Sequence, residues 1–128
     1  MNSNYSRLCS LLVVLGTAHT LLGQNLDMDL MKAAATGRVA EIKPLIAKGA
    51  NVNARHGSYA MSPLMIAAFR GRKAVVEILL ASGAEVNLPD KDGAPALNYA
   101  VLGASVDGSL PDKNQAVIDV LKAKGGNV

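Results

Sequence analysis

The side chains that most often carry enzyme chemistry are few in this sequence, and they do not cluster. There is one cysteine, Cys9, and there are two histidines, His19 and His56. Cys9 and His19 lie in the N-terminal 23 residues, so the rest of the chain holds one histidine and no cysteine. A Cys–His nucleophile and a clustered His/Cys metal site are therefore excluded there, because each needs several such side chains together. No phosphate-binding Gly-x-x-x-x-Gly-Lys-Ser/Thr loop occurs either.

Two short-range acidic pairs are the remaining candidates for acid–base or cation chemistry. Asp27 and Asp29 precede an apolar helical pattern, and we interpret them as helix-start capping. Asp90 and Asp92 are interpreted as turn residues, together with Gly93. Neither pair has a plausible general-acid partner, and the lysine between the second two argues against anything beyond a weak cation contact. We predict no catalytic, metal-binding or cofactor-binding residue and no cofactor, and we expect that the protein is not an enzyme.

The composition favours a small helical domain. The chain has 128 residues, half of them hydrophobic, with no Trp, one Phe and three Tyr. A core must then be built from Ala, Leu, Ile, Val and Met, which suits thin, close-packed helices better than a sheet sandwich. The formal net charge is +3, and the only tight group of cations is Arg70, Arg72 and Lys73. Because no aromatic residues are interleaved with a basic stripe, we interpret these cations as solvated and predict no nucleic-acid partner.

Residues 1–23 have the order of a secretory signal peptide. A polar start with one positive charge is followed by an uncharged apolar run from Leu8 to Ala18 and then by small residues. Cleavage after Gly23 leaves a polar start, whereas cleavage after Ala18 fits the small-residue rule better, and both sites stay open. An uncleaved anchor is the alternative, but the strongly apolar run is about a dozen residues, short of the roughly 20 that cross a bilayer. We therefore expect an exported protein, periplasmic or secreted.

One segment of the sequence repeats at a fixed distance. Gly49-Ala-Asn-Val-Asn53 returns 34 residues later as Gly83-Ala-Glu-Val-Asn87, and a shorter, altered copy occupies residues 125–128. The stretch 37–49 also aligns with 71–83 without a gap. Self-similarity at this period is typical of supersecondary units that stack side by side, and it favours binding over catalysis.

The middle unit contains the signals of a helix pair. Ser62 is a good N-cap, and Pro63 suits the first position of a short helix that ends near Gly71. Gly71 supplies the positive φ with which a helix ends. A second helix over residues 73–81 has apolar residues at helical spacing, and an extended turn follows it.

Together these motifs resemble the ankyrin repeat, a β-turn finger followed by two antiparallel helices with the motif Thr-Pro-Leu-His-x-Ala. Ser62-Pro63-Leu64-Met65-Ile66-Ala67 matches this motif, and Leu97-Asn98-Tyr99-Ala100 matches its end in the next unit. The resemblance implies an all-α solenoid of about three helix-turn-helix units with β-turn fingers, placed after the signal peptide. The implied domain covers residues 24–128, and its units span about 26–53, 54–87 and 88–128.

Some positions depart from the family's pattern. Met65 takes the place of the motif's histidine and residues 95–98 replace the motif, so we expect the family's Thr–His hydrogen bonding to be absent. Pro44 falls within the second helix of the first unit and predicts a kink or a late helix start. An insertion of nine residues within the turn-rich stretch 103–114 separates the last two helices, of which the final one is predicted over 116–124. We interpret it as a tolerated surface loop; a binding lip or a cover over the last helix pair is the alternative.

The resemblance also implies where a partner would bind, namely on the finger tips and on the exposed ends of the inner helices. Phe69 beside Arg70 is our first choice, because aromatic residues and Arg dominate interface hot spots; the alternative is that Phe69 fills space against a neighbouring unit. His56 is interpreted first as an exposed loop residue and second as a partner contact, and Tyr99 as half-buried structure. Carried over to this chain, the implied positions are Arg55, His56, Ser58, Tyr59, Met61, Lys91, Asp92 and Ala94 in the fingers, and Ala35, Thr36, Phe69, Arg70, Leu102 and Gly103 at the helix ends.

The function implied is that of a non-catalytic adaptor of bacterial type that binds a protein partner in the periplasm or outside the cell. We expect a monomer of limited stability, with no small-molecule substrate. A secreted effector that binds a host protein is one alternative. A membrane-tethered stabiliser of a membrane or periplasmic complex is the other, if the signal is not cleaved.

Overall fold

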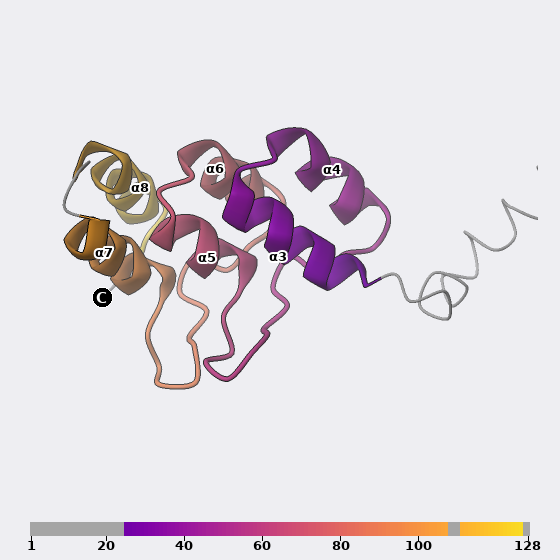
Figure 1. The fold of residues 1–128 in the computed structure, drawn as a ribbon, viewed down its shortest axis with the longest axis horizontal. Helices are drawn as coiled ribbons and strands as arrows, with labels where there is room; N and C mark the ends of the chain where they lie inside the picture. The colour runs from indigo at the N-terminus through magenta and orange to yellow at the C-terminus, as the bar shows by residue number, and fades with distance from the viewer. Residues whose placement is uncertain (1–24, 108–110, 127–128) are drawn as a thin grey trace, which may run out of the picture.

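The computed structural model describes residues 25–107 and 111–126, which form three stacked helix pairs (Figure 1). The predicted all-α repeat solenoid is confirmed, and the described part contains no β-strand beyond one isolated bridge. None of the described helices combines the length and the apolar character that a membrane-spanning helix needs. The pairs are α3 (Leu26–Thr36) with α4 (Val39–Ala47), α5 (Pro63–Phe69) with α6 (Lys73–Ala81), and α7 (Ala96–Asp107) with α8 (Pro111–Ala123).

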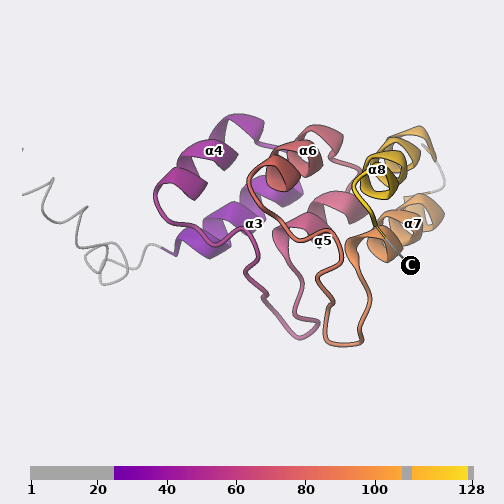
Figure 2. The same cartoon turned by 180° about the vertical axis from the view of Figure 1, so that it is seen from behind.

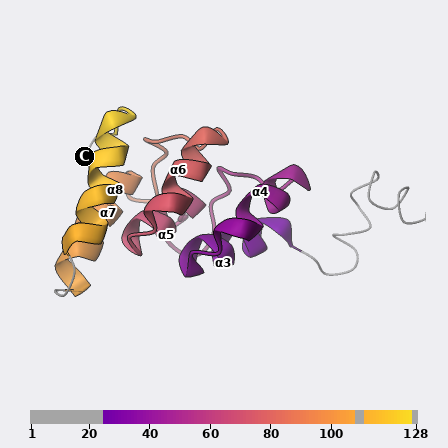
Figure 3. The ribbon, with the colours of Figure 1, turned by 90° about the horizontal axis from the view of Figure 1, so that it is seen from above.

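The helices form two layers. The first helices of the pairs, α3, α5 and α7, lie in one row and α4, α6 and α8 in the other, and the three pairs stand side by side when the stack is seen from above (Figure 3). Two long loops, the fingers, extend on the same side beyond α5 and α7 (Figure 2). Small side chains permit this close stacking, since Ala34, Ala67, Ala68 and Ala100 are fully buried between neighbouring helices.

The middle unit folds as its sequence predicts. The Ser62 hydroxyl accepts a hydrogen bond from the backbone N–H of Met65 at 3.3 Å, Pro63 opens α5, and Gly71 has a φ of 68°. The bounds of α6 are those predicted. Met65, which replaces the histidine of the motif, also forms a hydrogen bond at this position. Its Sδ accepts from the N–H of Ser62 at 3.4 Å, so Ser62 and Met65 form a reciprocal capping box.

The repeated asparagine of each finger entry joins successive units. The side chain of Asn53 accepts from the N–H of Glu85 at 2.8 Å and donates to the carbonyl of Gly83 at 3.4 Å. One unit later, Asn87 donates to the carbonyl of Gly125 at 3.1 Å. The repeated motif therefore has a structural role, since its last residue binds the backbone of the next copy.

Two expectations for the first unit are corrected. α4 begins at Val39, five residues before Pro44, so the predicted late helix start is wrong. The cap of α3 comes from Asn25, whose side chain accepts from the N–H of Met28 at 3.1 Å. Asp27 instead binds the N–H of Asn51 at 2.8 Å and so ties the first helix to the following finger entry.

The predicted loop at 103–114 is helical on both sides. α7 continues to Asp107 and α8 begins at Pro111, not at residue 116, so most of the insertion lengthens the last two helices. Residues 108–110 lie outside the described part, as do the predicted signal peptide and the last two residues. The interpretation of the whole segment as a surface loop is therefore wrong.

One buried amide in this lengthened part fixes it to the middle unit. Asn114 is 5% exposed, and its Nδ2 lies 3.1 Å from the carbonyl oxygen of Ala68, 3.3 Å from that of Phe69 and 3.2 Å from that of Ala100. It thus supplies side-chain donors to two carbonyls at the end of α5 and to one carbonyl of α7. Gly103 is buried at the same place. The helices approach so closely there that a Cβ on this residue would overlap the carbonyl of Phe69.

Candidate functional site

A groove of about 490 Å³ lies between the two fingers and the helices α5 and α7. It combines an apolar wall with a few polar groups. The residues predicted to contact a partner that line it are Phe69, Tyr59, Met61, Asp92, Ala94 and Leu102. The complete lining is Tyr59, Met61, Ile66, Phe69, Asp90, Asp92, Ala94, Asn98, Tyr99 and Leu102.

The first finger is a short hairpin with an exposed tyrosine at its tip. His56 and Met61 exchange both backbone hydrogen bonds at 2.9 Å, and the chain turns between them through positive φ at Gly57 (79°) and Ala60 (53°). Positive φ is strained for a residue with a Cβ, so Ala60 is held there by the hairpin. Tyr59, 57% exposed, stands at the end of this turn.

The second finger is tied to the first. The N–H of Lys91 donates to the carbonyl of Tyr59 at 3.0 Å, and the Lys91 ammonium lies 5.0 Å from the centroid of the Tyr59 ring, a cation–π distance. These contacts hold the two tips together at one rim of the groove.

The shape of the second finger depends on the buried carboxylate of Asp90. Its Oδ1 accepts from the backbone N–H groups of Asp92 and Ala94, both at 2.8 Å, and its carbonyl accepts from Gly93. The interpretation of Asp90 as a turn residue is confirmed. Its Oδ2 accepts from the Tyr99 hydroxyl at 2.6 Å, which connects the finger to α7.

The pKa values of this pair move apart. The hydrogen bond from Tyr99, and then that from the Ala94 N–H, lower the pKa of Asp90, so this carboxylate is charged at neutral pH. Burial, followed by the hydrogen bond to Asp90, raises the pKa of Tyr99 to about 12. The interaction therefore joins a neutral phenol to an anion, and Tyr99 is half-buried structure, as predicted.

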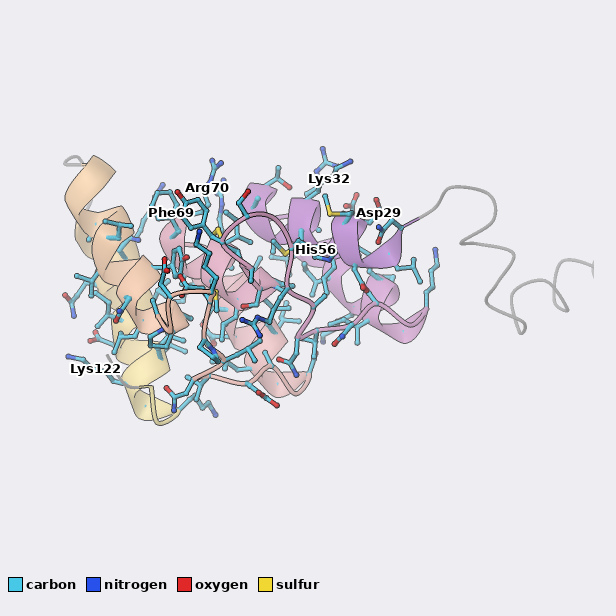
Figure 4. All side chains as sticks on the ribbon, turned by 90° about the horizontal axis from the view of Figure 1, so that it is seen from below. Asp29, Lys32, His56, Phe69, Arg70 and Lys122 are labelled. Carbon is cyan, nitrogen blue, oxygen red and sulfur yellow. The ribbon has the colours of Figure 1, made fainter. Side chains whose placement is uncertain are left out.

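Three other predicted residues, Arg70, His56 and Arg55, do not line the groove. Arg70 is exposed next to Phe69, and Figure 4 shows these two together and His56 apart from them. His56 is only partly exposed, and its Nε2 is buried without a hydrogen-bond partner within the described residues, so its interpretation as an exposed loop residue is wrong. Arg55 is exposed and contributes to lowering the pKa of Asp90.

The two predicted contacts of the first unit do not reach the groove. The carbonyl of Ala35 accepts from the Arg72 Nε at 3.3 Å, and the Thr36 hydroxyl donates to Lys32 in its own helix at 2.8 Å. Arg72 is therefore a link between units and not the solvated cation that was expected. Gly103, also expected to face a partner, is buried against α5.

Residues that the sequence did not single out complete the groove. Ile66 and Asn98 face it from α5 and α7, and the Asn98 Oδ1 is buried without a hydrogen-bond partner in the described part. Asn98 occupies the position of the histidine in the family's motif. That substitution is the signal in the sequence that could have pointed to this side chain.

The lining of the groove is apolar for the most part and includes a few ionisable side chains. Its ionisable groups are two carboxylates and two phenols, and of these Asp90 and Tyr99 are already bonded to one another. Within residues 25–107 and 111–126 no three His, Cys, Asp or Glu residues come together in a way that could hold a metal ion. What remains is an open apolar surface with acceptor groups.

Comparison with known proteins identifies a family whose model matches this chain. A family model described as ankyrin repeats (3 copies) matches the chain over residues 2–90 and again over residues 30–108. A search of the curated proteins found no match.

Proposed function

The chain belongs to the ankyrin repeat family, and from this premise we propose that it is a protein-binding module that uses the groove between its fingers and inner helices. Repeats of this family are generally protein–protein interaction modules and are typically not catalytic. The observation that carries the placement is the convergence of Tyr59, Met61, Phe69 and Leu102 on one open groove. Tyr59 and Leu102 are more than half exposed, and with the other lining residues they form an exposed apolar patch of the kind that marks interaction sites.

The groove is pre-organised, which supports the same proposal. The tips of both fingers are bonded to each other, and the second finger is bonded to α7 through Asp90 and Tyr99. Parts that are already fixed lose little conformational entropy when a partner binds, and affinity improves accordingly.

We also propose that the protein acts outside the cytoplasm, as an adaptor in the periplasm or outside the cell. The support is the polar, apolar and small-residue order of residues 1–23. Mass spectrometry of the protein recovered from its source tests this proposal. A new N-terminus after Gly23 or Ala18 is expected, whereas an intact N-terminus in the membrane fraction would favour the tethered alternative.

Affinity capture from an extract of exported proteins tests the binding role. The native chain is compared with Phe69→Ala/Arg70→Ala and with Leu102→Ala, whose side chain is 51% exposed and therefore contributes little to the fold. Val39→Ala, an exposed apolar residue outside the groove at 38%, is the matched control. We expect one protein to be retained by the native and control chains and lost by both groove variants. Equal retention by all four chains would remove the groove from the proposal.

A further inference from the structure

The groove concentrates two kinds of side chain that are scarce or dispersed elsewhere. All three aromatic residues of the described part, Tyr59, Phe69 and Tyr99, line it. Two carboxylates, Asp90 and Asp92, line it with them, and no Lys, Arg or His does. The whole chain carries 13 basic and 10 acidic residues, so the charge of the groove is opposite in sign to that of the molecule.

The free polar groups of the groove accept hydrogen bonds. The carboxylate of Asp92 has no ion pair or hydrogen bond within the described residues, where only its backbone N–H is used. The one hydroxyl that could donate from deep in the groove, that of Tyr99, is committed to Asp90. A ligand that complements this surface brings donors and positive charge.

The molecule itself shows that these aromatic rings attract a cation. The ammonium of Lys91 lies 5.0 Å from the centre of the Tyr59 ring at the rim. Phe69 and Tyr99 have no such cation among the described residues. Aromatic faces next to carboxylates, at a partly desolvated site, are the setting in which cation–π attraction is strongest.

We propose that the groove receives an arginine or lysine side chain of the partner protein, an inference that rests on the proposed function. The aliphatic stem packs between Phe69 and Leu102, and the charged end meets the carboxylate of Asp92. A purely apolar side chain would cover Asp92 without giving its carboxylate a donor, which carries a desolvation cost. An acidic side chain would be repelled by both carboxylates.

Amide chemical-shift titration of the full chain tests this with three defined probes: the N-acetyl methylamides of arginine, norleucine and glutamate. We expect the arginine probe to shift the amides of Asp92, Asn98 and Tyr99 and to bind about two- to fivefold more tightly than norleucine, as for a partly exposed charge pair. The glutamate probe should leave these amides unchanged. Added salt should weaken the binding of arginine and not that of norleucine.

Asp92→Asn should remove the preference for arginine over norleucine, while Glu85→Gln, the matched loss of one exposed charge outside the groove, should keep it. Equal binding of arginine and norleucine to the native chain, an Asp92→Asn chain that keeps the preference, or shifts that lie only outside the groove would each overturn the inference. The proposed function fails separately. If a captured protein is lost with Leu102→Ala but retained with Asp92→Asn, the groove binds a partner without this cation contact.

Discussion

At the scale of single residues, Asp90 and Tyr99 show how one contact fixes the position of a whole loop. The carboxylate holds the second finger in its turn through two backbone N–H groups, and the phenol connects that finger to α7. Each group shifts the ionisation of the other, so the contact can be followed by titration.

We expect one tyrosine of the native chain to ionise near pH 12, and Tyr99→Phe to abolish that step. The raised pKa means that the folded state holds the phenolic proton more tightly than the unfolded chain, whose tyrosines ionise near pH 10. The stabilising effect is therefore complete below about pH 10 and is lost as the pH rises through 12. Ultraviolet absorbance against pH measures the ionisation, and an unchanged titration in Tyr99→Phe would contradict the assignment.

The acid side of the same contact gives a second expectation. Because the folded-state pKa of Asp90 is lowered, its stabilising effect is present above its unfolded pKa of about 3.9 and is lost as the pH falls through the folded value. In Tyr99→Phe the largest cause of that lowering is gone. The pKa of Asp90, followed by its carboxyl resonance, should move up towards its ordinary value, and no movement would show that the backbone N–H groups alone set it.

Gly103 is the residue that permits the close approach of α7 to the end of α5. A Cβ at this position would overlap the Phe69 carbonyl and lie 2.7 Å from the Asn114 Nδ2. We expect Gly103→Ala to lower the free energy of unfolding by about 1–3 kcal/mol, as overpacking does. Urea denaturation measures it, with Val101→Ala on the exposed side of α7 as a control expected to change by less than about 0.5 kcal/mol. Similar values for both would mean that the helices separate at little cost.

At the scale of the elements, the last helix pair differs most from expectation. Gly103, Pro111 and Asn114 were interpreted as turn signals, but each has another role. Gly103 provides space between helices, Pro111 is the first residue of α8, where proline is favoured, and Asn114 donates to carbonyls of a neighbouring unit. Composition alone cannot separate these roles, because those of Gly103 and Asn114 depend on contacts with α5, which is distant in sequence.

We expect the Asn114 side chain to contribute more to the free energy of unfolding than its size indicates. Asn114→Ala removes the buried side-chain donor that the carbonyls of Ala68, Phe69 and Ala100 share, and we expect a loss of about 1–3 kcal/mol in the free energy of unfolding. Its exposed neighbour Gln115, whose amide reaches only Asp119 within the same helix, is the control. Gln115→Ala should change stability by a few tenths of a kcal/mol. If the two substitutions cost the same, the link between α8 and α5 has no energetic role.

The middle unit was predictable because its signals are local. The cap at Ser62, the glycine at the end of the turn and the apolar spacing of α6 all act within a few residues. The groove was predictable in part. Phe69 and Tyr59 follow from the position of their elements in the repeat, whereas Asn98 joins them only through the packing of α7 on α5.

At the scale of the whole molecule, the units share one core. Leu79 on α6 is fully buried, and α6 contacts both α4 and α8. We expect Leu79→Ala to cost about 2–5 kcal/mol. The loss should appear as one shifted transition rather than two, since each unit depends on its neighbours for burial. Urea unfolding followed by circular dichroism and by tyrosine fluorescence checks both, and a loss below about 0.5 kcal/mol or two separate transitions would contradict a shared core.

The two asparagine joints have a consequence for how such a chain can change length. Asn53 and Asn87 each donate to the carbonyl of the corresponding glycine in the next unit, so the two joints share this hydrogen bond. A duplicated block of 34 residues placed between them would find the same hydrogen-bond partner on each side. Duplication of one unit would therefore keep this joint intact, whereas a change in the groove, which two units line together, alters a surface that both share.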